Sequence, residues 1–153
     1  MCRRINAFKS LTMKGNDKLH EAYICLGSNE PDAAARVGAA ASRLSALVEE
    51  EAFSGAYATR PAPPADPDGP EYVNAVMRVS SPLSLRELQQ LLKDLEAALG
   101  RRSEHKQSGR VVIDLDVVVY DGEVCRVAEF ASSYFMHGYR LCIGSNTGGN
   151  PVR

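Results

Sequence analysis

Hydrophobic positions in the first half of the chain switch between the spacing of strands and the spacing of helices. A short apolar segment ends at Gly27-Ser28-Asn29, as a strand ends at a turn. Apolar residues then recur every three to four positions behind Asp32, a residue type that can cap a helix. The predicted elements are a strand at 21–26, a helix at 32–48, and strands at 51–59 and 71–79.

The second predicted helix carries the clearest local signals. Ser84-Leu-Arg-Glu87 has the pattern of a capping box, and Gly100 occupies the position where left-handed backbone ends a helix. One apolar stripe runs between them and consists of Leu85, Leu88, Leu92, Leu95 and Leu99. Residues 111–120 then predict a strongly apolar strand, which Asp121-Gly122 ends with a turn.

The order of these elements is strand, helix, strand, strand, helix, strand. It predicts the α+β class, a ferredoxin-like βαββαβ sandwich with two helices on one face of a mostly antiparallel sheet. Residues 60–70 contain five of the chain's eight prolines, so an ordered loop or a lid is expected there. Because this fold supports many functions, the site has to be argued separately.

The distribution of charge indicates where the domain begins and ends. Residues 1–20 carry five basic residues and a single acid without periodicity, which favours a disordered basic extension. An upstream start with Met13 as the alternative, and an organelle transit peptide, are further interpretations. Residues 21–143 are the predicted single catalytic domain, and residues 144–153 a Gly/Asn-rich tail.

Composition disfavours several classes of function. A net charge of -1 argues against a basic surface for duplex nucleic acid, and the absence of Trp argues against a stacking platform for single strands. No stretch approaches about 20 consecutive apolar residues, so no membrane span is expected. The four cysteines show no Cys-x-x-Cys spacing, which favours a reduced, cytoplasmic protein without a zinc site or a disulfide framework.

Two aspartates interrupt the last predicted strand. Asp114 and Asp116 share one face, about 7 Å apart along the strand, opposite an apolar face that runs from Val111 to Val119. Asp is a poor strand former, so the pair needs an explanation. The interpretations are a solvent-facing edge, a pair of oxygen ligands for Mg²⁺ that holds nucleotide phosphates, and an ion pair with nearby arginines. The last two are compatible.

Arginines bracket the loop before this strand, at Arg101, Arg102 and Arg110. Guanidinium groups bind phosphate oxygens through paired hydrogen bonds, and a metal neutralises developing charge, so arginines beside two carboxylates suit phosphoryl transfer. The chain has neither a Walker-type glycine-rich motif nor Gly-x-Gly-x-x-Gly, so neither a P-loop nor a Rossmann site is supported.

Several short motifs occur in the order and spacing of one enzyme family. They are Tyr23-Ile-Cys-Leu-Gly-Ser-Asn29, Tyr72-Val-Asn74, Glu96 with Gly100-Arg101, and Ile113-Asp-Leu-Asp116. Over residues 21–140 the chain resembles 6-hydroxymethyl-7,8-dihydropterin pyrophosphokinase of folate biosynthesis. The resemblance implies a ferredoxin-like fold, ATP as co-substrate and two Mg²⁺ ions. It also implies transfer of the β,γ-pyrophosphate of ATP to the pterin hydroxymethyl oxygen, with release of AMP.

The same resemblance implies a role for each matching residue. Asp114 and Asp116 match the family's magnesium-binding aspartates. Together with Arg101 and Arg110 they form the expected catalytic group. The residues expected to bind ATP are Glu96, Arg101, Arg110, Tyr134 and Arg140. Those expected to bind the pterin are Thr59, Tyr72 and Asn74. The side-chain amide of Asn74 offers a donor and an acceptor together.

Several positions at which the family binds ATP carry other residues in this chain. Val111 stands where the family usually has an arginine, and Arg110 precedes it by one residue, which places Arg110 on the opposite face of a strand unless a bulge intervenes. Ser103 and Ser108 replace a second arginine and an aromatic residue, and Tyr134 replaces a histidine. The alternative function is therefore a pterin- or nucleotide-binding protein with weak or lost transfer activity. A ferredoxin-like RNA-binding domain is disfavoured by the missing aromatic platform.

Overall fold

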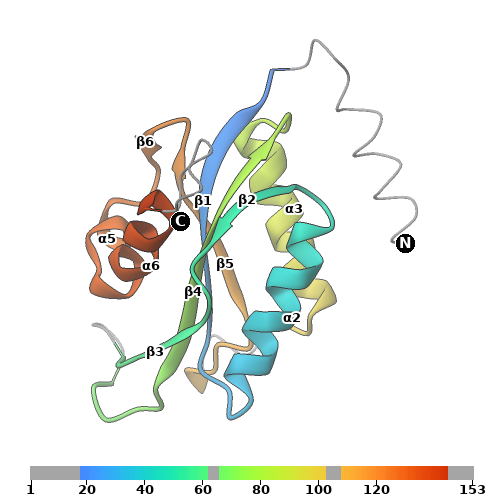
Figure 1. Cartoon of the computed structure of the whole chain (residues 1–153). Coiled ribbons are helices and arrows are strands. Elements are labelled where there is room, and N and C mark those ends of the chain that lie inside the picture. Colours follow the sequence, from blue (N-terminus) through green and yellow to red (C-terminus); the bar gives the residue numbers. More distant parts are fainter. Residues whose placement is uncertain (1–17, 62–65, 103–107, 145–153) are drawn as a thin grey trace.

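The fold is an antiparallel sheet with helices on both faces (Figure 1). The structure is a computed structural model that describes residues 18–61, 66–102 and 108–144. Its strands are β1 (His20–Ser28), β2 (Glu49–Phe53), β3 (Tyr57–Thr59), β4 (Tyr72–Ser81), β5 (Asp114–Tyr120) and β6 (Glu123–Val124). Its helices are α2 (Ala33–Ser45), α3 (Leu85–Ala98), α5 (Val127–Ala131) and α6 (Ser133–Gly144). Within these ranges no helix combines the length and apolar character that crossing a membrane requires.

The strand order confirms the predicted fold class. The six-stranded sheet runs β2-β4-β1-β5-β6, with β3 paired to β4 off this path. β1 lies antiparallel to both β4 and β5, so the first strand of the domain becomes the centre of the sheet. α2 and α3 cover one face, as the βαββαβ order predicts for a ferredoxin-like fold (Figure 1).

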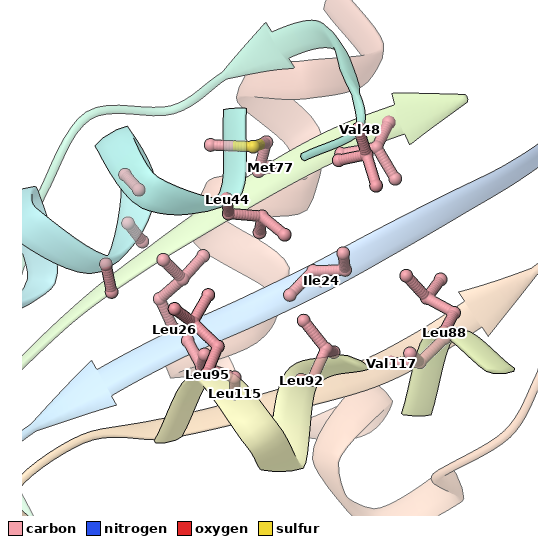
Figure 2. Close-up of a cluster of buried hydrophobic side chains, with 14 of the residues drawn as sticks. Ile24, Leu26, Leu44, Val48, Met77, Leu88, Leu92, Leu95, Leu115 and Val117 are labelled. Carbon is pink, nitrogen blue, oxygen red and sulfur yellow. The ribbon is translucent and has the colours of Figure 1, made fainter. Parts of the chain in front are cut away.

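The larger hydrophobic core fills the space between this face and helices α2 and α3 (Figure 2). Its fully buried side chains include Ile24, Leu26, Leu44, Met77, Leu88 and Leu92. The predicted capping box at the start of α3 is confirmed, because Glu87 N–H donates to Ser84 Oγ and Ser84 N–H donates to Glu87 Oε1. Asp32 does precede α2, but its carboxylate accepts a hydrogen bond from Arg36 Nε (2.7 Å) and not from a helix amide. The predicted side-chain cap is therefore wrong.

The segment predicted as one strand at 51–59 forms two strands. β2 ends at Phe53 and β3 begins at Tyr57, and Gly55 between them has a φ of 79°, a left-handed conformation that breaks the ladder. Both strands still pair with β4, so the break redirects the chain along the same neighbour.

The strand that carries the two aspartates also differs from its prediction. β5 begins at Asp114, not at residue 111, because Val112 and Ile113 are both buried in the α2/α3 core and so break the alternation of a strand. A register shift opposite Tyr23 and Ile24 then moves Val119 to the other face of the sheet. The predicted apolar face from 111 to 119 is correct only for its central residues.

The second face of the sheet is covered by α5 and α6, which the sequence analysis did not assign (Figure 1). A smaller cluster there joins Tyr23, Val76 and Val118 of the sheet to Phe135 and Cys142 of α6. Phe135 is fully buried, and the rings of Phe135 and Tyr139 stack with their centroids 5.4 Å apart. The spacing of these α6 residues is a helical signal that the sequence does contain.

Helix α6 approaches the sheet closely at Gly138. A Cβ atom on Gly138 would lie 2.6 Å from Val76 Cγ2 and 2.5 Å from the Tyr57 hydroxyl oxygen. Tyr57 in turn donates a hydrogen bond to the Tyr134 carbonyl oxygen (2.6 Å), which ties β3 to the first turn of α6. The absence of a side chain at Gly138 therefore sets the distance between α6 and β4.

Replacing Gly138 by alanine should lower the free energy of unfolding by about 1–3 kcal/mol, because the new methyl group overlaps Val76. Gly38→Ala is the matched control, since Gly38 lies on the exposed side of α2 and its Cβ would meet nothing within 4 Å. That change should be neutral or stabilising by up to about 1 kcal/mol, because alanine is the better helix former. Chemical denaturation measures both variants, and equal effects would contradict the close approach of α6.

Candidate functional site

Asp114 and Asp116 occupy alternate positions at the start of β5, beside the central strand β1. In the register of the two strands Asp114 lies opposite Gly27 and Asp116 opposite Cys25. The side chain of Asp114 is 41% exposed and that of Asp116 only 19%. The two predicted aspartates therefore lie at neighbouring alternate positions of β5, with the Asp114 carboxylate at the surface and the Asp116 carboxylate largely buried.

Glu96 and Arg101, at the end of α3, join this pair from the other side of β5. Gly100 has a φ of 104°, and the chain turns there so that Arg101 N–H reaches the Glu96 carbonyl oxygen (3.0 Å). Arg101 Nη1 lies 2.5 Å from Asp114 Oδ1 and 3.1 Å from Glu96 Oε2. Glu96 is 8% exposed, and its Oε2 also accepts a hydrogen bond from Leu115 N–H (2.6 Å). One guanidinium is thus held between two carboxylates.

The electrostatics of the pair favour a bound cation. Burial raises the pKa of Asp116 to about 8, and the charges of Asp114 and Glu129 add to the shift. Burial also raises the pKa of Glu96, against the opposing effects of Leu115 N–H and Arg101. Burial therefore favours the protonated form of Asp116, and a divalent cation bound between the carboxylates would take the place of that proton.

The two aspartates fit magnesium as a ligand set. Mg²⁺ is usually bound through one or two carboxylates, with water and substrate phosphates completing its coordination. In the described part of the chain no three His, Cys, Asp or Glu side chains converge as a fuller ligand set. An ion at Asp114 and Asp116 would accordingly keep positions for phosphate oxygens.

Ser28, the last residue of β1, and Asn29 after it fix the segment that leads into β5. Asn29 Nδ2 donates to the Gly109 carbonyl oxygen (3.0 Å), and Asn29 Oδ1 accepts from Val111 N–H (2.7 Å). The Val111 carbonyl oxygen accepts from Asn29 N–H (2.9 Å) and from Ser28 Oγ (3.1 Å). Two segments that lie far apart in the sequence are therefore joined through both backbone and side chains.

A cavity of about 1020 Å³ lies beside this junction. It is lined by α2 and its preceding turn, the proline-rich loop, the start of β4, Arg101 and residues 108–111. Glu30 and Arg110 form a two-point ion pair in its wall, with Arg110 Nε 3.0 Å from Glu30 Oε2 and Nη2 2.9 Å from Oε1. Arg101 lines the cavity and also contacts Asp114, so the cavity and the aspartate pair are contiguous.

The three residues predicted to bind a pterin lie together on β3 and β4. Tyr72 pairs with Thr59 in the register, and Asn74 Nδ2 donates to Thr59 Oγ1 (2.6 Å). Asn74 is 4% exposed, and its Oδ1 lies only 2.7 Å from the place that a Cβ on Gly27 would occupy. Tyr72 is one of the described residues that line the cavity, whereas Thr59 and Asn74 are not among its lining residues. Glycine at position 27 thus makes room for the Asn74 amide.

Comparison with known proteins agrees with the resemblance drawn from the motifs. A model of the 7,8-dihydro-6-hydroxymethylpterin-pyrophosphokinase (HPPK) family matches residues 23–146. The chain belongs to this family. It is 33% identical over 125 residues to the 2-amino-4-hydroxy-6-hydroxymethyldihydropteridine pyrophosphokinase of Haemophilus influenzae, over 80% of this chain and 76% of that protein.

A second HPPK relative matches a shorter part of the chain. The protein of the same name from Methylorubrum extorquens is 35% identical over 101 residues, which make up 66% of this chain and 63% of that protein. The chain thus spans less than two thirds of the length of that relative.

The remaining residues that the HPPK resemblance assigned to ATP are dispersed. Tyr134 opens α6 half-buried, and burial, with the charge of Glu129 adding to it, raises its pKa to about 12. Arg140 is exposed on α6 and has no hydrogen bond or ion pair with the described residues. Arg110 precedes β5, so alternation along a strand does not orient it, and its guanidinium is bound to Glu30. Ser103 lies outside the described residues.

Two residues near Asp116 were missed by the sequence analysis. Arg126 Nε lies 3.9 Å from Asp116 Oδ2 and 2.6 Å from Glu129 Oε1. Their spacing of three residues on a short helix gives a weak signal for an ion pair with each other. Nothing in the sequence indicates that the pair stands beside Asp116, because that contact depends on how α5 packs against β5.

The raised pKa of Asp116 predicts how magnesium binding should depend on pH. Because the folded chain holds this proton more tightly than the unfolded chain, the metal-free protein should lose stability as pH rises from about 4 to about 8. Mg²⁺ competes with that proton, so it should raise the melting temperature at pH 8.5 more than at pH 6. Asp116→Asn should remove the difference, whereas Asp94→Asn, on the exposed side of α3, should retain it. Equal shifts at both pH values would contradict this metal assignment.

Proposed function

We propose that the protein transfers the β,γ-pyrophosphate of ATP to the hydroxymethyl oxygen of 6-hydroxymethyl-7,8-dihydropterin in folate biosynthesis, with release of AMP. Membership of the HPPK family supports this reaction. The observation that carries it is the Asp114/Asp116 pair, joined through Arg101 to a cavity large enough for substrates. The free thiols of Cys25, Cys125 and Cys142 support a reducing compartment such as the cytoplasm.

Asp114 and Asp116 are the proposed ligands of Mg²⁺, bound as two ions. Bound Mg²⁺ would neutralise charge on the phosphate oxygens and on the departing AMP oxygen. Arg101 is proposed to bind phosphate from the opposite side, since its position is fixed by Glu96 and Asp114 at the cavity wall. Glu96 therefore acts as a positioning residue for Arg101, and through Leu115 N–H for β5.

In the proposed reaction the pterin hydroxymethyl oxygen attacks the β-phosphorus of ATP. The bond from that phosphorus to the oxygen bridging the α-phosphate breaks, and its electron pair leaves with AMP. The hydroxyl proton passes to solvent or to a phosphate oxygen. The protein contributes mainly position and charge, as in other phosphoryl transfers.

The pterin is proposed to bind at the start of β4, against Tyr72 and next to Thr59 and Asn74. The Asn74–Thr59 hydrogen bond fixes the amide, so that its polar atoms have one orientation. Tyr134, near Glu129 and Asp116, is proposed to lie on the nucleotide side. Arg110 and Arg140 would act on ATP only after a rearrangement, which for Arg110 means releasing Glu30.

One observation favours the alternative, a binding protein with weak or lost transfer. Val111 stands at a position where the HPPK pattern usually has an arginine, and its backbone N–H and carbonyl are both bound by Asn29. No guanidinium can come from that position. Calorimetry that shows pterin and nucleotide binding without turnover would select the alternative over the enzyme.

The assay that tests the proposal is AMP formation from ATP, Mg²⁺ and the hydroxymethyl dihydropterin. Asp116→Asn should lower kcat/KM by about 100-fold or more, because it removes a charged metal ligand at the reacting phosphates. Asp94→Asn makes the same chemical change at an exposed carboxylate of α3 and should leave activity unchanged. Chelation of Mg²⁺ should abolish activity. Activity that persists in Asp116→Asn would contradict the site, and no AMP from the wild type would contradict the reaction.

A further inference from the structure

Arg126 lies near Asp116 without a hydrogen bond to it, whereas Arg101 is hydrogen-bonded to Asp114. Arg126 lies between β6 and α5, and its Nε contacts Glu129 Oε1 at 2.6 Å and Asp116 Oδ2 at 3.9 Å. Arg101 follows α3 and Arg126 precedes α5, and these helices cover opposite faces of the sheet (Figure 1). The two aspartates are therefore flanked by one guanidinium from each face.

The two arginines differ in how fully they are already bound. Arg101 Nη1 contacts Asp114, Glu96 and the Ile113 carbonyl oxygen, and the side chain is 29% exposed. The contacts of Arg126 with described residues all pass through Nε, and its side chain is 54% exposed. The terminal amino groups of Arg126 therefore have no acceptor within the described part of the chain. They form the open end of a guanidinium whose other end is held by Glu129.

The distribution of charge indicates what this open end would bind. Asp114, Asp116 and Glu129 place carboxylates close to Arg126, so another anion would be repelled unless a cation bound with it. A metal-bound polyphosphate meets that condition, because the metal offsets the carboxylates and the phosphate oxygens accept from the guanidinium. A free carboxylate ligand does not.

We infer that Arg126 is a nucleotide-binding residue, whose terminal amino groups donate to a phosphate oxygen of the metal-bound nucleotide at Asp114 and Asp116. Glu129 is the positioning residue that holds Nε and so orients the guanidinium. This inference rests on the proposed function for the identity of the nucleotide. It assigns the phosphate contact to a residue outside the motifs that carry the family resemblance.

A purely structural role for Arg126 makes a different prediction. If the pair with Glu129 only fixed the start of α5, then removing either partner would have the same consequence. Arg126→Gln and Glu129→Gln would lower the melting temperature alike and change nucleotide affinity alike. If Arg126 binds phosphate, only its own removal deletes the donor, whereas Glu129→Gln retains it and removes a competing negative charge.

The test is the affinity for the Mg²⁺ complex of α,β-methylene ATP, measured by calorimetry on the full chain. Arg126→Gln should weaken binding by about 10- to 100-fold, the range expected for a hydrogen bond between charged groups. Arg126→Lys should recover part of the loss, since it keeps the charge without the fork. Glu129→Gln should bind as tightly as the wild type or more tightly, because the glutamine amide oxygen can still accept from Arg126 Nε while the competing negative charge is removed. Arg86→Gln, in the first turn of α3, is the control for loss of an exposed arginine.

Binding of the pterin alone, followed by fluorescence, should be unchanged in Arg126→Gln. The inference is overturned if Arg126→Gln binds the analogue within twofold of the wild type, or if Glu129→Gln weakens binding equally. Its failure is distinct from failure of the proposed function. A wild type that forms AMP, with an Arg126→Gln variant of unaltered affinity, removes the inference alone. A wild type that forms no AMP but binds the analogue through Arg126 removes the reaction alone.

Discussion

The Glu96 carboxylate is the contact on which the proposed site depends. It is almost fully buried near the end of α3, where it accepts from Leu115 N–H and pairs with Arg101. Burying a carboxylate is costly, and here the cost is offset by one backbone donor and one guanidinium. The contact with Leu115 holds β5 against α3, and the contact with Arg101 holds that side chain beside Asp114. The geometry of the aspartate pair and the packing of the fold therefore share one interaction.

A second junction brings the two halves of the chain around the cavity. Ser28 ends β1, Asn29 follows it, and both bind the segment 109–111 through side chains and backbone. Glu30 continues the junction by binding Arg110. Because these contacts come from residues adjacent in sequence, the turn after β1 holds the segment before β5 in one position. Both segments line the cavity, so these contacts fix that part of its wall.

The two faces of the sheet are packed by different helices and carry different side chains. The face under α2 and α3 contains the larger core, in which leucines and valines from both helices and three strands interlock. The other face carries α5 and α6, packed through Phe135, Tyr139 and the close approach at Gly138. That second layer places Arg126, Glu129 and Tyr134 near Asp116. Charged groups reach the aspartates from both layers, and the edge of the sheet where they meet is the proposed site of transfer.

The fold class and the aspartate pair could be predicted from the sequence, because both depend on local patterns. The α3 capping box, the leucine stripe and the Asp-Leu-Asp alternation each act within one element, where spacing alone decides which side chains share a face. The glycine inside the segment 51–59 was a local sign of the break at Gly55, but the register shift that turns Val119 away depends on pairing with a distant strand, so no local pattern indicated it. Arg110 and Arg126 show the same difference between what the sequence predicts and what tertiary packing decides. Their sequence positions favoured Arg110 as the phosphate ligand, yet Arg110 binds Glu30, and Arg126 stands at Asp116. Only tertiary packing decides which carboxylate a long cationic side chain reaches.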